Sequence, residues 1–130
     1  MHKVLIGLAA LLLLVHGLIH LMGTTVYMKM GLIQGLPYKT TLLGSHWEVG
    51  ENGMRLFGAL WVLPALGFIL SAIALISGSA LIQPLLVATA LLSLLLTLLD
   101  WSTAYAGAIV NVVILCVVLL GPRLLAWSGQ

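Results

Sequence analysis

Two histidines, His16 and His20, lie four residues apart within residues 4–27, a stretch that contains no formally charged side chain. Helical spacing places both imidazoles on one face of a helix. An imidazole surrounded by hydrocarbon is costly without a hydrogen-bond partner, so a histidine inside such a stretch is a candidate functional residue. The pair is therefore the first candidate for a polar site in this chain.

A transition metal is one possible partner for the two imidazoles. Histidines at positions i and i+4 of a helix can bind one metal ion, but this HxxxH spacing lacks the intervening glutamate of zinc proteases. The metal-ligand candidates are His16, His20 and His46, with Asp100 or Glu48 as other sources of a third ligand. A haem suits the pair less, because two residues on one helix face cannot bind opposite sides of one iron.

An amphiphilic ligand such as a quinone is a second possible partner. It requires an apolar slot with one or two hydrogen-bonding groups, which His16, His20 and Asn111 could supply. A third interpretation is structural, in which the histidines form hydrogen bonds across a helical bundle and hold its helices in register. The sequence leaves these interpretations open.

The composition of the chain sets its class. Of 130 residues, 62% are hydrophobic and 6% are charged, and the mean hydropathy is +1.24. Soluble domains are far less apolar, and this length has room for about four membrane spans of about 20 residues each. Five Lys and Arg against three Asp and Glu give a formal charge of +2, too small and too scattered for a nucleic-acid surface. The sequence predicts an integral membrane protein.

Charged residues and helix breakers divide the chain into four predicted spans within a single membrane domain. These spans cover residues 4–27, 52–77, 80–99 and 102–121. Pro64 is expected to kink the second span or to free a carbonyl in it, and Gly121 with Pro122 is expected to end the fourth. The predicted fold class is all-α, a membrane-embedded four-helix bundle with a long loop between helices 1 and 2.

The long loop, residues 28–51, holds most of the polar side chains of the chain. Its glycines and proline favour an irregular or partly helical cap on the membrane surface, with Tyr27, Tyr38 and Trp47 as interfacial anchors. The same composition fits a solvated connector, although loops of this length are often functional.

Polar residues of different spans fall at similar depths below this loop. With a helical rise of about 1.5 Å per residue, His20 lies roughly 10 Å, Asn111 roughly 13 Å and His16 roughly 16 Å below the loop side. We therefore expect these three side chains to line a polar pocket that opens beneath the loop.

Charged and aromatic residues are expected at the rim of this pocket. Asp100 and Trp101 lie between the third and fourth spans, and Arg55 enters the second span from the same side. An ion pair between Arg55 and Asp100 is the preferred arrangement, with snorkelling to lipid headgroups as the alternative. The loop residue Glu48 can reach the same rim. The predicted ligand-binding set is His16, His20, Asn111, Arg55, Asp100, Glu48 and Trp101.

Two segments carry short motifs, HGLIHLMG at residues 16–23 and DWSTAYAGAIVN at residues 100–111. They resemble the HGxIHLxG and AxxGxxxN elements of a group of small four-helix bacterial membrane proteins of unassigned function. Arg55, Gly58 and Trp61 match the middle element of that group. In the group an acidic residue follows the tryptophan, whereas here Asp100 precedes Trp101. The resemblance implies the fold and no reaction.

Both ends of a four-span chain lie on one side of the membrane. Basic residues barely distinguish the two sides, but Glu48, Glu51 and Asp100 make the loop side the more acidic one. We therefore expect cytoplasmic termini in a bacterial inner membrane.

The sequence predicts a small accessory or ligand-binding membrane subunit, acting beside a larger complex, as a homo-oligomer, or by holding an amphiphilic molecule. The alternative is a metal- or haem-dependent redox protein that uses His16 and His20 as ligands. A transporter component fits least, because few polar residues mark the half of the bundle away from the loop. The sequence contains no phosphate-binding loop, CxxC pair or nucleophile elbow.

Overall fold

The computed structural model describes the backbone of residues 2–128 and the side chains of residues 3–122. Its elements are α1 (His2–Tyr27), β1 (Thr41–Leu42), β2 (Trp47–Glu48), α2 (Gly50–Leu60), α3 (Val62–Ile76), α4 (Ile82–Leu99) and α5 (Trp101–Ser128). Within the described residues, four helical segments are long and apolar enough to span a membrane: α1, α2 with α3, α4, and α5. The predicted all-α class is confirmed, and the chain is consistent with a multi-pass membrane protein.

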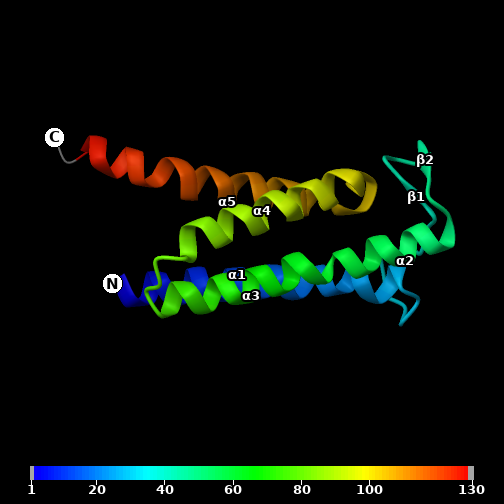
Figure 1. Cartoon of the computed structure of the whole chain (residues 1–130), viewed down its shortest axis with the longest axis horizontal. Helices are drawn as coiled ribbons and strands as arrows, with labels where there is room; N and C mark the ends of the chain where they lie inside the picture. The colour runs from blue at the N-terminus through cyan, green and yellow to red at the C-terminus, as the bar shows by residue number, and fades with distance from the viewer. Residues whose placement is uncertain (1, 129–130) are drawn as a thin grey trace.

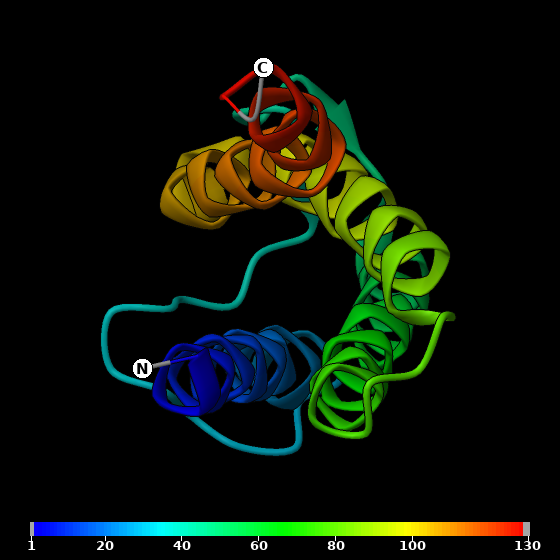
Figure 2. The same cartoon turned by 90° about the vertical axis from the view of Figure 1, so that its left-hand side faces the viewer.

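The helices form an open arc. α1 packs against α2 and α3, α3 packs against α4, and α4 packs against α5. Viewed along the helices, α1 and α5 are the two open edges of this arc (Figure 2). α1 and α3 form one layer and α4 and α5 the other, and the start of α1 and the end of α5 lie at the end of the molecule away from the loop (Figure 1).

The second predicted span is divided between two helices. α2 and α3 meet at Trp61, one turn before Pro64. Proline has no N–H for the carbonyl of Leu60, and the next bond, from Ala65 N to Trp61 O, is stretched to 3.5 Å. The proline therefore leaves the carbonyl of Leu60 without its helical partner, and the regular helix is interrupted at Trp61, one turn before the proline.

The fourth apolar span, Trp101–Pro122, agrees with its prediction, but the helix that contains it extends further. α5 continues to Ser128 with Pro122 inside it, so the prediction that Gly121 and Pro122 end the helix is wrong. Apolar helices of membrane proteins tolerate an internal proline more readily than soluble helices do. The irregular residue of α5 is instead Ala104, near the start of the helix, with φ −113° and ψ 16°.

The loop contains a short β-hairpin and no helix among its residues 28–49. β1 and β2 pair antiparallel, with Thr41 opposite Glu48. The residues between the strands include Leu43, Gly44 and Ser45, which all have positive φ and make the turn tight. Of the two forms expected for this cap, irregular or partly helical, residues 28–49 have the irregular one, and the local turn chemistry adds a hairpin to it.

A backbone hydrogen bond attaches the hairpin to the bundle. Leu43 N donates to Leu99 O, the last carbonyl of α4, at 2.8 Å. The terminal carbonyls of a helix have no partner within the helix, so this bond satisfies one of them. The hairpin is thereby held over the turn between α4 and α5, where the candidate site begins.

The core consists of two apolar clusters separated by polar side chains. The cluster nearer the loop contains Val26, Tyr27, Leu42, Met54, Phe57, Trp61 and Leu96. The cluster nearer the chain ends contains Ala10, Leu13, Phe68, Ala72, Leu86 and Ala90. The buried His16, His20, Ser93 and Asn111 lie between them along the helices.

A close approach of backbones holds α1 against α3. A Cβ atom added to Gly17 would lie 2.9 Å from Ala65 O and 3.1 Å from Phe68 Cβ. Small residues at such contacts allow membrane helices to approach closely. Gly17 therefore fixes the spacing of the two helices that carry the histidines and the aromatic rings around them.

We predict that Gly17→Ala lowers the free energy of unfolding by about 1–3 kcal/mol through overpacking. Gly7→Ala is the matched control on the same helix, because nothing lies within 4 Å of a Cβ atom at Gly7. Reversible unfolding of both variants in mixed detergent micelles measures the difference. Equal stability of the two variants would contradict the close α1–α3 contact.

Candidate functional site

The histidines of α1 belong to a hydrogen-bonded chain that crosses three helices. His16 Nε2 lies 3.2 Å from Oδ1 of Asn111 on α5, and Asn111 Nδ2 donates to Ser93 Oγ on α4 at 2.7 Å. Ser93 Oγ lies 2.6 Å from His20 Nε2, and His20 Nδ1 lies 2.8 Å from the carbonyl oxygen of His16. The structure thus brings together the two histidines and the asparagine that the depth argument grouped.

The positions of the hydrogens follow from the one fixed acceptor, the carbonyl of His16. No acidic side chain of the described residues bonds to either ring, and a buried unpaired charge is costly, so we take both rings as neutral. His20 Nδ1 then carries its hydrogen, and His20 Nε2 accepts from the Ser93 hydroxyl. Ser93 Oγ accepts from Asn111 Nδ2, which leaves Asn111 Oδ1 to accept from His16 Nε2–H. His16 Nδ1 is left as a bare lone pair.

A second polar network surrounds Asp100 at the turn between α4 and α5. Asp100 is 1% exposed, and its carboxylate accepts hydrogen bonds from the Tyr27 hydroxyl, Lys39 Nζ and the Thr103 hydroxyl. Lys39 forms an ion pair with Asp100 and donates to Ser102 Oγ at 3.0 Å. This buried carboxylate is therefore paired in charge and supplied with donors from α1, the loop and α5.

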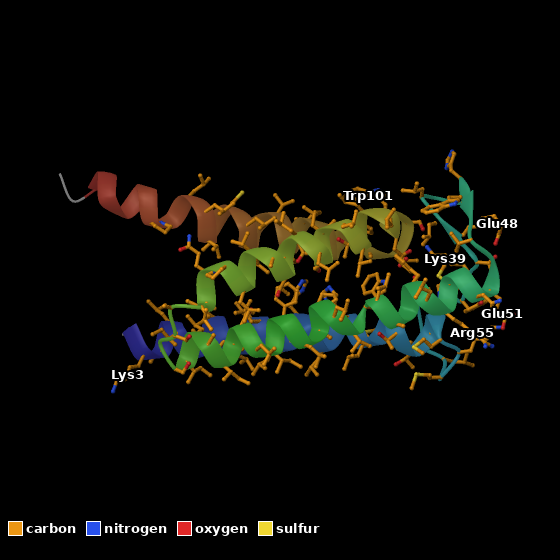
Figure 3. All side chains as sticks on the ribbon, in the orientation of Figure 1. Lys3, Lys39, Glu48, Glu51, Arg55 and Trp101 are labelled. Atoms are coloured by element: carbon orange, nitrogen blue, oxygen red, sulfur yellow. The ribbon has the colours of Figure 1, made fainter. Side chains whose placement is uncertain are left out.

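The predicted ion pair between Arg55 and Asp100 does not form. Arg55 is half exposed and bonds to Glu51 one turn earlier on α2 at 2.8 Å, and Lys29 also pairs with Glu51 at 3.0 Å. Glu and Arg at positions i and i+4 of one helix meet without any tertiary contact. Figure 3 shows Glu51 and Arg55 together at the loop end of the molecule, with Lys3 at the opposite end.

Three other predicted residues lie apart from these networks. The exposed Glu48 accepts a hydrogen bond from a backbone N–H two residues ahead, and the exposed His46 bonds to a carbonyl three residues earlier. Trp101 is exposed and packs against Tyr105. Across the described residues, no group of three His, Cys, Asp or Glu comes together that could hold a metal ion. His46 therefore does not join His16 and His20 as a third ligand.

A cavity of about 360 Å³ lies between α1 and α5, and we call it the side cavity. Its lining runs from His16 to Tyr27 on α1 and from Thr103 to Val110 on α5, with Trp61, Thr97 and Asp100 behind and the loop residues Gln34, Gly35 and Leu36 above. The stretch of α1 involved is about 16 Å long at the usual helical rise. Polar contacts between α1 and α5 mark both ends of it, the buried His16–Asn111 bond and the Tyr27–Thr103 contact of 3.3 Å.

The open side of the side cavity is apolar. Ile19 and Met22 of α1 are 51% and 39% exposed, and Val110 of α5 is 41% exposed, yet all three line the cavity. They lie on the two helices that form the open edges of the arc (Figure 2). In a chain whose helices cross a membrane, this opening faces the acyl chains, while the polar groups lie behind it.

The structure adds residues to the site that the sequence argument missed. Tyr27, expected to be an interfacial anchor, is fully buried and bonds to Asp100. Lys39 replaces Arg55 as the partner of that carboxylate, and Ser93 connects the histidines to Asn111. A buried aspartate near the end of a span requires a cation, which was the available signal for Lys39. Serine within an apolar helix gives no comparable signal.

No protein-family model, curated protein sequence or solved structure matches the chain. The resemblance to small bacterial membrane proteins therefore stays a prediction. The chemical interpretation of the site depends on its geometry alone.

We predict that Lys39→Met lowers the free energy of unfolding by about 3 kcal/mol, because the buried Asp100 loses its counter-ion. Lys29→Met is the matched control, since Lys29 pairs with Glu51 at the exposed surface and such pairs contribute at most about 1 kcal/mol. Unfolding in mixed micelles measures both variants.

The double variant Lys39→Met with Asp100→Asn tests the cause of this loss. Removing the charge of the carboxylate removes the reason for the destabilisation, so the double variant should regain much of the stability lost in Lys39→Met. A double variant as unstable as the sum of the two single variants would argue against the buried ion pair.

We predict that Ser93→Ala destabilises the protein by about 1–3 kcal/mol, because it leaves both His20 Nε2 and Asn111 Nδ2 without a partner. Ser71→Ala is the matched control. Ser71 is equally buried, but its hydroxyl donates only to Gly67 O on its own helix. Thermal unfolding in detergent compares the two, and an equal effect would mean that Ser93 does not connect the histidine chain.

Proposed function

We propose that the protein binds an uncharged amphiphilic molecule from the bilayer in the side cavity, with a quinone-like head group as one example. The observation that supports this most is the combination of an apolar opening between α1 and α5 with polar groups behind it. Such a site holds the head group against hydrogen-bonding side chains while the tail stays among acyl chains.

The size and charge of the side cavity support this proposal. Its volume of about 360 Å³ is at the small end of the range for ligand pockets. It fits a ring or a short polar head with the first part of a chain. The one carboxylate at the cavity, Asp100, is already balanced by Lys39. An uncharged head group therefore adds no unpaired charge to a buried site.

The metal- or haem-dependent alternative has less support. His20 uses both ring nitrogens in hydrogen bonds, and His16 uses Nε2 for Asn111. A metal ligand needs a free nitrogen lone pair, so binding a metal through both histidines would break the chain that links the helices. A binding role leaves that chain intact.

We place the protein in a bacterial inner membrane with both ends in the cytoplasm. The motif resemblance supports the bacterial membrane, and the acidic residues Glu48, Glu51 and Asp100 on the loop side support the orientation. An accessory role beside a larger complex or a second copy is the next proposal. The exposed apolar side chains of the four spans would supply the contact surface.

A photoreactive amphiphile tests the binding proposal in lipid nanodiscs that contain the full chain. The probe carries a diazirine on its alkyl chain and a benzoquinone head, and it is used both oxidised and reduced to the hydroquinone. We expect at least one form to label peptides of α1 and α5 that line the side cavity.

Matched variants separate cavity binding from labelling by the surrounding lipid phase. Ala106→Phe should reduce labelling several-fold, because Ala106 lines the open side of the cavity and has room for a larger side chain. Ala9→Phe places the same ring at an exposed position of α1 outside the cavity and should leave labelling unchanged. Labelling that is equal in all three proteins would overturn the proposal.

A further inference from the structure

We infer that the side cavity selects amphiphiles whose head group donates a hydrogen bond. An alcohol, phenol or hydroquinone would then be held more tightly than the ether, ketone or quinone of the same shape. This inference rests on the proposed function and extends it by naming the class of head group. It follows from where the polar side chains of the cavity direct their own hydrogens.

The first acceptor is His16. Its Nε2–H is directed at Asn111, and no described residue bonds to its Nδ1. A ring nitrogen without a hydrogen only accepts. His16 lines the cavity, so its free lone pair suits a ligand that brings a hydroxyl hydrogen.

The hydroxyl groups that line the cavity already donate their hydrogens to acceptors within the protein. Thr97 donates to the carbonyls of Ser93 and Leu94 on its own helix, at 2.9 and 3.0 Å. Tyr27 and Thr103 both donate to the carboxylate of Asp100. Each of these oxygens retains lone pairs. The ligand therefore meets hydroxyl oxygens as acceptors.

Asp100 adds the strongest acceptor, because hydrogen bonds to a charged group are stronger than those between neutral groups. It lines the cavity and carries the charge that Lys39 balances. A cationic head group would add a second positive charge beside Lys39 and leave the site unbalanced. A neutral donor, meaning a hydroxyl, fits better than an ammonium group.

Two donors also belong to the lining. The indole N–H of Trp61 has no partner, and Trp61 is about as buried as Tyr27, Thr97 and Asp100. Gln34 offers an amide from the exposed loop. Acceptors therefore outnumber free donors among the polar groups that the helices contribute to the cavity.

Matched pairs of ligands test this inference in nanodiscs. Para-octylphenol is compared with its methyl ether, and decanol with its methyl ether, by displacement of the photoreactive probe. Binding to empty nanodiscs corrects for partition into lipid. We expect the hydroxyl compound of at least one pair to bind roughly fivefold to tenfold more tightly, as one hydrogen bond of this kind provides. The pair that shows the preference tells a phenolic ligand from an aliphatic one.

Thr97→Val tests whether the hydroxyl oxygen of Thr97 contributes to this preference, because valine keeps the shape of the threonine side chain. Valine has no hydroxyl oxygen, so this variant should reduce the ratio between the hydroxyl compound and its ether. Thr25→Val is the matched control, because Thr25 donates to a carbonyl four residues earlier in the same way and does not line the cavity. The control should leave the ratio unchanged.

The outcomes separate this inference from the proposed function. If both members of each pair bind equally well and Ala106→Phe removes that binding, the cavity holds amphiphiles but does not select donors, and the inference fails alone. If none of the compounds displaces the probe and Ala106→Phe leaves the extent of labelling unchanged, the proposed function fails and the inference fails with it. A preference for the ethers would also overturn the inference.

Discussion

Four polar side chains are buried in this apolar bundle, and the hydrogen-bonding groups of each must be paired with those of the others. The rest of the structure depends on this constraint. His16, His20, Ser93 and Asn111 come from α1, α4 and α5, and they form one continuous chain of hydrogen bonds. Without water nearby, each unpaired group would cost free energy comparable to a lost hydrogen bond. An arrangement that separated the three helices at this level would leave these groups unpaired, so the hydrogen bonds favour the observed register.

This chain of hydrogen bonds helps to hold the two edge helices of the open arc together. α1 and α5 are the edges of the arc, and their two polar contacts lie about 16 Å apart along α1, at His16–Asn111 and at Tyr27–Thr103. The helices are joined at these two levels, and the side cavity occupies the space between them. The hydrogen bonds of the histidines and the cavity proposed for binding are therefore two consequences of one arrangement.

The sequence predicted the elements that depend on local pattern and depth. Apolar runs located the four spans, and the helical rise placed His16, His20 and Asn111 at similar levels. The same reasoning failed for Arg55, because depth alone cannot tell which way a helix faces. Arg55 lies on the outer side of α2 and pairs with Glu51, a partner that the i and i+4 spacing already offered.

Other parts of the site depend on tertiary placement that no local pattern encodes. Lys39 reaches Asp100 because a hairpin bonded to the end of α4 carries the loop over that turn. A loop of this length has no periodicity from which to infer its path. The role of Ser93 could not be predicted from the sequence either, because serine in a membrane helix commonly bonds to its own backbone, as Ser71 does.

The lateral opening of the side cavity between Ile19, Met22 and Val110 has a consequence for the binding proposed at this site. A molecule that arrives through this opening comes from the lipid phase and never needs to dissolve in water. Occupancy then depends on how many ligand molecules accompany each lipid, and diluting the whole sample with buffer leaves it unchanged. The composition of the host membrane, more than the surrounding solution, would set how often the site is filled.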